Sequence, residues 1–413
     1  MMKDLADSAY VTQRAFLWTR VLDTPFWALF NMLFIILYKD LGATPFQLAV
    51  VIALKPLSSL FSMYWSHAIT ERRDRLLSNV MVGGVLRHLP FFFFPWIENT
   101  WLVIAAFGFH MSLARGVQPA WMEILKINIP GITRDKVFAW GSSIGYIGDA
   151  LVASSVALVL DGYFQAWRWI FPLAAFISLF ALYFQSKIPI PEGGRTAPPS
   201  EEKGALKPLT DPWKKAWGLI KSRPDFMHFQ IAFMLAGSGL MILQPTLPIF
   251  FVDVLNLSYT EFALAFTVCK GIGFALASPI LARLIGRIDI FLFTSLVTFS
   301  LAIFPLLLML ANGGIIWLYL GYIAYGVMQA GSNLSWNLSG PIFSRDEDSS
   351  LFTSINVATV GIRGMIAPAL GSAIFPFIGA FGVMGVSSVI CMSAAFHLIS
   401  CSRREREASS LGA

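Results

Sequence analysis

The chain has 413 residues, of which 56% are hydrophobic and only 13% are charged, and its formal net charge is +6. A soluble protein typically carries about 25% charged residues, so a soluble chain of this composition would expose much apolar surface to water. The composition therefore excludes an ordinary soluble globular protein and favours a chain dissolved in a lipid bilayer. The excess positive charge does not indicate nucleic acid, because the cations lie mostly in short segments between apolar runs.

Long apolar segments follow one another along the chain. A helix needs about 20 apolar residues to cross the hydrocarbon core of a bilayer. Six such segments precede a polar stretch: 15–38, 46–66, 77–97, 101–124, 137–160 and 168–186. Six more follow it: 227–252, 261–284, 288–310, 315–339, 351–376 and 381–401. The predicted fold class is an all-α membrane protein with twelve transmembrane helices in two pseudo-symmetric six-helix bundles.

The polar stretch divides the chain into three predicted parts. These are an N-terminal bundle over 1–186, a cytoplasmic linker over 187–222, and a C-terminal bundle with a short cytoplasmic tail over 223–413. The end of the linker, Trp213–Lys221, is amphipathic and basic, which favours a short helix at the membrane surface over an ordinary loop.

The lysines and arginines outside the spans are distributed unevenly. One predicted side of the membrane carries only Lys39 and Arg168, whereas the other carries both chain ends, the linker and the remaining basic loops. Cytoplasmic loops are enriched in Lys and Arg. We therefore expect both termini and the linker to be cytoplasmic, in a multi-pass protein of the cell (inner) membrane. We expect no cleaved signal peptide, because Asp4 and Asp7 precede the first apolar span.

The two halves contain similar segments in the same order. Pro130–Asp135 after the fourth span resembles Pro341–Asp346 after the tenth. Leu41–Thr44 before the second span resembles Leu255–Ser258 before the eighth. Equivalent segments in two six-span halves indicate a parallel repeat of two bundles.

Two further segments resemble a known family. His67–Arg75 carries Glu71, Arg72 and Arg75 where the family's loop between helices two and three has an acid and two cations, although both glycines of that pattern are missing. Trp167–Phe171 resembles the family's Trp-Arg-Trp-x-Phe start of helix six. On these residues the chain resembles the major facilitator superfamily.

The resemblance implies two bundles that rock about a central cavity lined by helices one, two, four, five, seven, eight, ten and eleven. It also implies that charges in the loop after helix two hold one conformation of the bundles. We assign a conformational gate to that loop and to the arginines of the repeated segments: Glu71, Arg72, Arg75, Arg134 and Arg345.

Charged residues inside the spans are costly and usually functional. Six cations lie within spans: Arg20, Lys55, Arg87, Arg115, Lys270 and Arg363. They face two acids, Asp23 and Asp149. We expect Arg87 to pair with a buried acid such as Asp149. Arg20 and Asp23 are neighbours on one helix face, and their mutual neutralisation is an alternative to a functional role. About four cations then lack a protein counter-ion, which favours an anionic organic solute such as a carboxylate or phosphate ester.

These charges and nearby polar groups form the predicted transport site. The predicted substrate-binding residues are Arg20, Lys55, Arg115, Gln244, Lys270, Asn333 and Arg363. Asp23 and Asp149 are the predicted proton-coupling residues. Burial raises the pKa of a carboxyl group and a nearby cation lowers it, so substrate binding could shift the balance.

The predicted function is secondary active transport of a small anionic solute by alternating access, coupled to an ion or proton or working by exchange. Efflux of drug-like or lipid-like compounds is an alternative, and a receptor, scaffold or membrane-embedded enzyme is an alternative of another class. The histidines show no metal-ligand spacing, and Cys269, Cys391 and Cys401 show no pairing framework. We therefore expect no catalytic residue, cofactor, metal or disulfide. The expected partners are a small-molecule substrate and the lipid bilayer, with no nucleic acid, for a monomeric protein.

Overall fold

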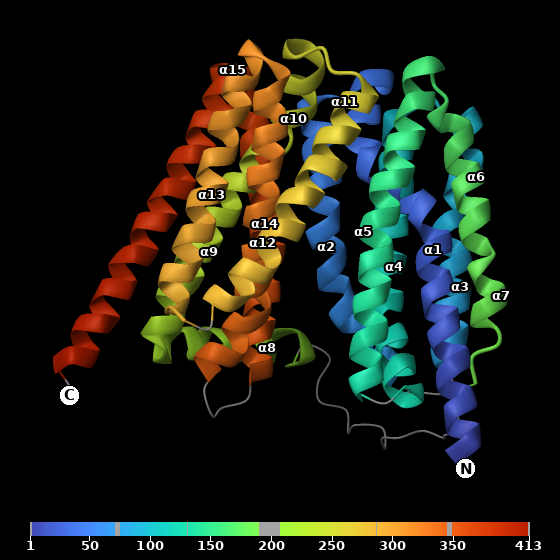
Figure 1. The fold of residues 1–413 in the computed structure, drawn as a ribbon, viewed down its shortest axis with the longest axis horizontal. Helices are drawn as coiled ribbons and strands as arrows, with labels where there is room; N and C mark the ends of the chain where they lie inside the picture. Colours follow the sequence, from blue (N-terminus) through green and yellow to red (C-terminus); the bar gives the residue numbers. More distant parts are fainter. Residues whose placement is uncertain are drawn as a thin grey trace. The chain divides into compact units, whose positions relative to one another are not determined.

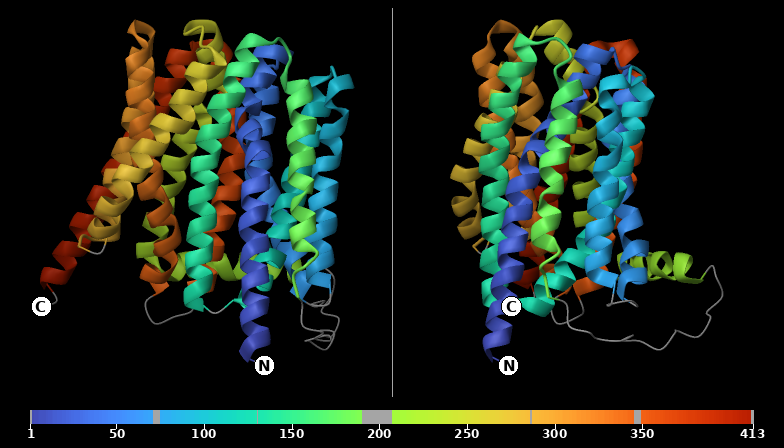
Figure 2. Two further views of the ribbon diagram at one scale, coloured as in Figure 1. Left: turned by 45° about the vertical axis from the view of Figure 1, so that its right-hand side comes forward. Right: turned by 90° about the vertical axis from the view of Figure 1, so that its right-hand side faces the viewer.

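The computed structural model describes residues 2–70, 75–129, 131–189, 207–285, 287–344 and 349–411. Every regular element within these residues is a helix (Figures 1 and 2). The chain divides into two compact units. Unit 1 comprises Met1–Pro199 with Leu257–Ala263, and unit 2 comprises Ser200–Asn256 with Leu264–Ala413.

Unit 1 contains six helical rods. They are α1 (Met2–Leu41), α2 (Pro45–Thr70), α3 (Leu76–His88) continued by η2 (Leu89–Trp96), α4 (Thr100–Asn128), α5 (Gly131–Gly162), and α6 (Trp167–Leu179) followed by α7 (Ala181–Gln185). The third rod tightens into the 3₁₀ segment η2 where Pro90 and Pro95 occur. Proline lacks the backbone N–H that a continued α-helix would use.

Unit 2 begins with the amphipathic helix α8 (Lys207–Ser222), which confirms the helix predicted at the end of the linker. Its remaining elements are α9 (Pro224–Leu243), α10 (Thr246–Ile249), η3 (Phe250–Val254), η4 (Leu264–Cys269), α12 (Lys270–Leu284), α13 (Ile290–Leu310), η5 (Ala311–Gly313), α14 (Ile315–Ser344) and α15 (Ser349–Leu411). The short helix α11 (Tyr259–Ala263) precedes η4 in the chain but belongs to unit 1.

Helix α15 contains two membrane crossings. Its 63 residues would extend roughly 95 Å as one rod, about three times the hydrocarbon thickness. Gly379 breaks it with φ 65° and ψ −176°, an extended positive-φ conformation that is essentially restricted to glycine. Two spans result, as the sequence predicts.

Eight described segments are long and apolar enough to cross a membrane, and one of them, Thr359–Glu405, contains the break at Gly379. Helices α2, α5 and α14 add three rods of 26, 32 and 30 residues. The described helices are therefore consistent with the twelve predicted spans, and the all-α membrane fold is confirmed.

The predicted repeat extends to backbone conformation. Gly42 and Asn256 occupy the second position of the aligned segments Leu41–Thr44 and Leu255–Ser258, and their φ angles are 61° and 51°. Both residues thus adopt the left-handed conformation that ends a helix and turns the chain. Asn is among the non-glycine residues that tolerate this conformation best.

The helix starts after these turns also match. Thr44 Oγ1 accepts from Gln47 N at 3.3 Å, while Gln47 Oε1 accepts from Thr44 N at 2.8 Å. Ser258 Oγ accepts from Glu261 N at 3.1 Å, while Glu261 Oε2 accepts from Ser258 N at 2.9 Å. Each pair is a capping box that satisfies free N–H groups of the first turn. Equivalent positions of the two halves therefore use the same local chemistry.

A carboxylate of α5 binds the start of α11 within unit 1. Asp161 accepts hydrogen bonds from the backbone N–H groups of Tyr259 at 2.7 Å and Thr260 at 2.8 Å. Asp40, at the end of α1, accepts from the Tyr259 hydroxyl at 2.9 Å. Negative charge is favourable at a helix N-terminus, which explains why 257–263 packs with unit 1.

His110 of α4 lies in an aromatic core that fixes α1 and α3 beside α4. Its ring is fully buried, and Nδ1 donates to the carbonyl of Arg87 at 3.0 Å. Its centroid lies 4.7 Å from that of Phe26 and 4.8 Å from that of Phe30. This packing positions the charged residues of the next section.

Candidate functional site

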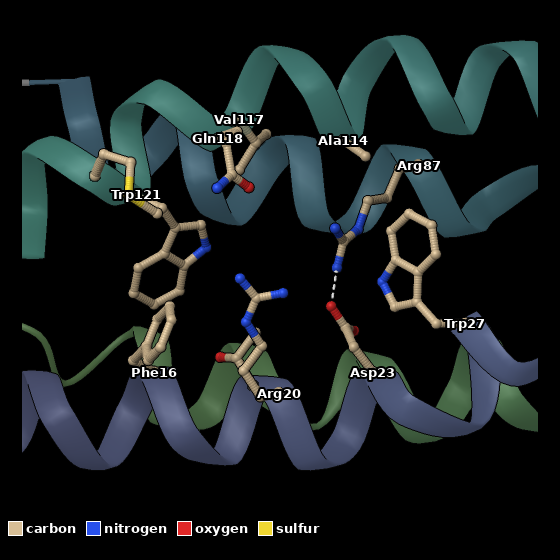
Figure 3. Close-up of a pocket in the computed structure, with 11 residues that line it drawn as sticks. Phe16, Arg20, Asp23, Trp27, Arg87, Ala114, Val117, Gln118 and Trp121 are labelled. Atoms are coloured by element: carbon tan, nitrogen blue, oxygen red, sulfur yellow. Dashed lines mark hydrogen bonds and ion pairs between the residues drawn. The ribbon is translucent and has the colours of Figure 1, made fainter. Parts of the chain in front are cut away.

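A cavity of about 520 Å³ lies in unit 1 between α1, α3 and α4. Phe16, Arg20, Asp23 and Trp27 of α1 are spaced three or four residues apart and therefore share the helix face that lines it. Arg87 of α3 and Gln118 and Trp121 of α4 lie opposite this face (Figure 3). The cavity thus contains two of the predicted site residues, Arg20 and Asp23.

Asp23 forms an ion pair with Arg87 across the cavity. Arg87 Nη2 lies 2.5 Å from Asp23 Oδ2, and the side chains are 13% and 9% exposed. The prediction that Arg87 pairs with a buried acid is confirmed, but the acid is Asp23 and not Asp149, which was named as the example. The position of a residue along its span does not show which face of the helix its side chain occupies.

Arg20 lies between this ion pair and the indole of Trp121 (Figure 3). Its guanidinium carbon is 5.2 Å from the Phe16 ring centroid, within cation–π range. Among the described residues, no ion pair involves Arg20. Asp23 still acts electrostatically on Arg20, but its ion-pair contact is with Arg87, so Arg20 does not neutralise Asp23 by a direct pair. Among the described residues that line this cavity, two arginines and one aspartate give a net charge of +1.

A second charged group lies in unit 1 on α2, α4 and α5. Asp149 accepts hydrogen bonds from Asn31 at 3.3 and 3.4 Å. Asp149 and Arg115 are the charged neighbours that act on the Lys55 ammonium, with opposite signs. The structure thus brings together three predicted residues, Lys55, Arg115 and Asp149. Asn31 is an addition that sequence reasoning missed, although a lone Asn in an apolar run is a signal.

Unit 2 has its own cavity, of about 420 Å³, lined by residues of α9, α13, α14 and α15. Arg363 of α15 borders it together with hydroxyl groups, among them Thr294, Thr298 and Ser332. Arg363 Nη1 donates to the Phe233 carbonyl at 2.7 Å. The Arg363 Nε is buried and has no hydrogen-bond partner among the described residues.

A phenylalanine that lines each cavity contacts a tryptophan, and this tryptophan lines the cavity in unit 1 but not in unit 2. Phe16 and Trp121 have ring centroids 5.7 Å apart in unit 1. Phe233 and Trp336 have ring centroids 5.8 Å apart in unit 2. The two tryptophans precede the repeated segments that the sequence aligned. The repeat therefore includes the cavity-lining residues Phe16 and Phe233.

The guanidinium groups beside these phenyl rings come from different helices. Arg20 follows Phe16 by four residues, and Gly237 follows Phe233 by four. A Cβ atom at Gly237 would overlap the guanidinium of Arg363, which occupies the space above this glycine. Arg363 also lies 4.7 Å from the Phe233 ring centroid. Each unit thus places one guanidinium against an equivalent phenyl ring, from α1 in unit 1 and from α15 in unit 2.

Three other predicted substrate-binding residues lie away from both cavities. Lys270 Nζ is 3.8 Å from the Phe266 ring centroid. Gln244 is half-buried between α9 and α10, and Asn333 is exposed on α14. None of the three lines the cavity of either unit.

The family model described as Major Facilitator Superfamily matches residues 17–342 of the chain. The chain belongs to the major facilitator superfamily. Its membership confirms the resemblance predicted from the loop and helix-six segments. No protein of curated function matches this superfamily member.

Solved structures of transporters share the fold of this superfamily member. A mutant of the nucleoside transporter NupG has a TM-score of 0.73 at 13% identity, covering 94% of this chain and 99% of that one. A POT family transporter in complex with 5-aminolevulinic acid has a TM-score of 0.74 at 14% identity, and the match covers 96% of each chain. A bacterial homologue of the human lysosomal transporter Spinster has a TM-score of 0.65 at 12% identity, and the match covers 96% of this chain and 97% of that one. At these identities the likeness concerns the fold.

The predicted gate of this superfamily member lies mostly outside the described residues. Glu71, Arg72 and Arg345 are outside them, as is the side chain of Arg134. Arg75 is exposed at the start of α3. The gate therefore stays a prediction.

Replacing Gly237 by Ala should displace the Arg363 guanidinium, because the added methyl group would occupy its position. The overlapping atoms are the end of a flexible side chain and can move aside, so the expected cost is about 1 kcal/mol, from the weakened hydrogen bond to the Phe233 carbonyl. Thermal unfolding of the purified protein should show the loss. Gly385→Ala on α15 is the matched control, since its Cβ would meet no atom within 4 Å. Equal melting temperatures for the two variants would contradict the close approach.

Proposed function

We propose that this superfamily member carries a small anionic organic solute, such as a carboxylate or phosphate ester, across the membrane by alternating access. The observation that carries the proposal is Arg20, which faces a cavity where Asp23, the acid among the described lining residues, is already paired with Arg87. A partly buried cation without a counter-ion is costly, and a bound anion offsets that cost.

The chemistry of the cavity supports an anion with a planar or tetrahedral oxygen group. A guanidinium binds carboxylate or phosphate with two parallel hydrogen bonds. Gln118 and the Trp121 ring lie beside Arg20, so the cavity also offers an amide and an aromatic face to the remainder of a small molecule.

We assign substrate binding first to Arg20 and Arg363, which line the cavities of their units. Lys55 and Arg115 are second, because they form a further net positive group with Asp149. Gln244, Lys270 and Asn333 stay in the proposal with less support, since they line neither cavity.

We also propose coupling to a proton or ion gradient, with Asp23 and Asp149 as the proton carriers. Both carboxylates have cationic neighbours. A bound anion would compete with each carboxylate for those cations and so favour its protonation. From the Lys and Arg distribution we infer that both termini lie on the cytoplasmic side of the cell's inner membrane. We also infer a monomer.

Thermal unfolding in detergent tests the substrate class. A panel of small carboxylates and phosphate esters should contain compounds that raise the melting temperature in proportion to ln(1 + [ligand]/Kd). Organic cations and neutral compounds of matched size should leave it unchanged. Stabilisation by drug-like cations or lipids and by no anion would favour efflux of such compounds instead.

A further inference from the structure

Two histidines and a cysteine meet where α9 begins and α15 approaches its end, within unit 2. The ligand atoms of His228, His397 and Cys401 all lie within 4.8 Å of one another. His397 Nε2 is 3.7 Å from Cys401 Sγ, and the two imidazole centroids are 5.4 Å apart. These side chains line neither of the two cavities.

The backbone arrangement suits joint coordination. His397 and Cys401 are four residues apart on α15, so their side chains share one helix face. His228 approaches them from α9. Cys401 is buried and both histidines are half-buried. The buried His228 Nδ1 has no hydrogen-bond partner among the described residues, and such groups in native proteins normally have one.

We propose that His228, His397 and Cys401 form a binding site for a divalent transition-metal ion, with Zn²⁺ as the best-fitting metal. Tetrahedral zinc, with bonds of about 2.0–2.1 Å to nitrogen and 2.3 Å to sulfur, sets its ligand atoms roughly 3.3–3.7 Å apart. His397 and Cys401 already have this separation. The ligand atom of His228 lies within 4.8 Å of both, so binding would require its side chain to move closer, and water would take the fourth position.

The ligand set selects the kind of metal. Thiolate and imidazole suit zinc, cobalt, nickel and copper, whereas magnesium and calcium prefer oxygen ligands. Because two helices contribute ligands, a bound metal would clamp the start of α9 to the end of α15. Beside the site, Ser402 Oγ donates to Asp289 Oδ2 at 2.8 Å, which already joins the start of α13 to α15.

The proposal departs from the expectation of no metal site. That expectation rested on ligand spacing along the chain. His228 lies on the first helix of its bundle and His397 on the last, so spacing could not show that they meet. The site stands whether or not the transported solute is an anion.

Cobalt absorption of the purified full-length protein in detergent, free of any histidine tag and treated with chelator, tests the proposal. Co²⁺ should give a thiolate-to-metal charge-transfer band at one ion per chain, which excess Zn²⁺ should abolish and Mg²⁺ should not. Cys401→Ser should remove the band, and His228→Gln should weaken Co²⁺ binding at least tenfold. Cys391 is a buried cysteine on the same helix, and Cys391→Ser should retain both the band and the Co²⁺ affinity. A wild-type protein without the band would overturn the proposal, as would a band that persists in Cys401→Ser.

A second measurement needs no substituted protein. Saturating Zn²⁺ should slow maleimide labelling of Cys401 in the wild-type chain at least tenfold, while labelling of Cys269 on η4 should not change. Peptide mass spectrometry can quantify both cysteines in one sample. Equal labelling of Cys401 with and without Zn²⁺ would also overturn the proposal.

Discussion

Replacing Arg20 by Gln should weaken binding of the anionic substrate by about 10- to 150-fold, because a hydrogen bond to a charged group contributes about 1.5–3 kcal/mol. The side chain would still reach the cavity but would lose the charge that the Asp23–Arg87 pair leaves uncompensated. Arg20→Lys should have an intermediate effect, since lysine keeps the charge but cannot form the bidentate hydrogen bonds of a guanidinium. Titration of each purified variant with a stabilising anion would measure the change in Kd.

Arg168→Gln is the matched control for Arg20→Gln. Arg168 is also an arginine of unit 1, but its guanidinium donates to the Pro95 carbonyl at 3.3 Å and does not line the cavity. The substrate Kd of this variant should stay within twofold of wild type. An equal loss in both variants would mean that net charge, and not the position of Arg20, governs binding.

Replacing Asp23 by Asn should strongly destabilise unit 1, because removal of one partner from a buried ion pair costs about 3–5 kcal/mol. Both side chains are largely buried, and the substitution would leave the Arg87 charge without its acid. The double variant Asp23→Asn/Arg87→Gln should recover most of the loss. Thermal unfolding of the wild type, both single variants and the double variant gives the coupling between the two residues.

Asp225→Asn provides the comparison for that cycle. Asp225 pairs with Arg223 at 2.9 Å, but the side chains are 26% and 18% exposed at the start of α9. A pair in contact with water contributes about 0–1 kcal/mol, so this variant should lose little stability. Additive losses in the Asp23–Arg87 cycle would show that the two groups do not interact.

Two single variants, Asp23→Asn and Asp149→Asn, test proton coupling. Gradient-driven accumulation should fail in at least one variant, while exchange of solute at equal concentrations persists. Accumulation that is intact in both would exclude these carboxylates as carriers.

The structural features that could be predicted from the sequence were those set by local chemistry. The length of the apolar segments predicted the spans. The predicted repeat also holds at the turns, where Gly42 and Asn256 both have positive φ angles. The amphipathic pattern of Trp213–Lys221 likewise predicted a helix now seen within α8.

Partners across helices were not predictable in the same way. A buried acidic partner for Arg87 was predictable, but the acid is Asp23 and not Asp149, because rotation of α3 decides which neighbour Arg87 faces. The cluster of His228, His397 and Cys401 depends on two helices far apart in the chain. Gly237 gave no sign of its role, since only packing shows that Arg363 needs the space above it.

Uptake into liposomes that contain the purified protein tests the central claim most directly. Vesicles loaded with a stabilising anion should take up the same labelled anion faster than protein-free vesicles, and Arg20→Gln should lower that rate at least tenfold while Arg168→Gln does not. Absence of any protein-dependent flux would favour a receptor, scaffold or enzyme, and flux of cations or neutral compounds alone would contradict the anion assignment.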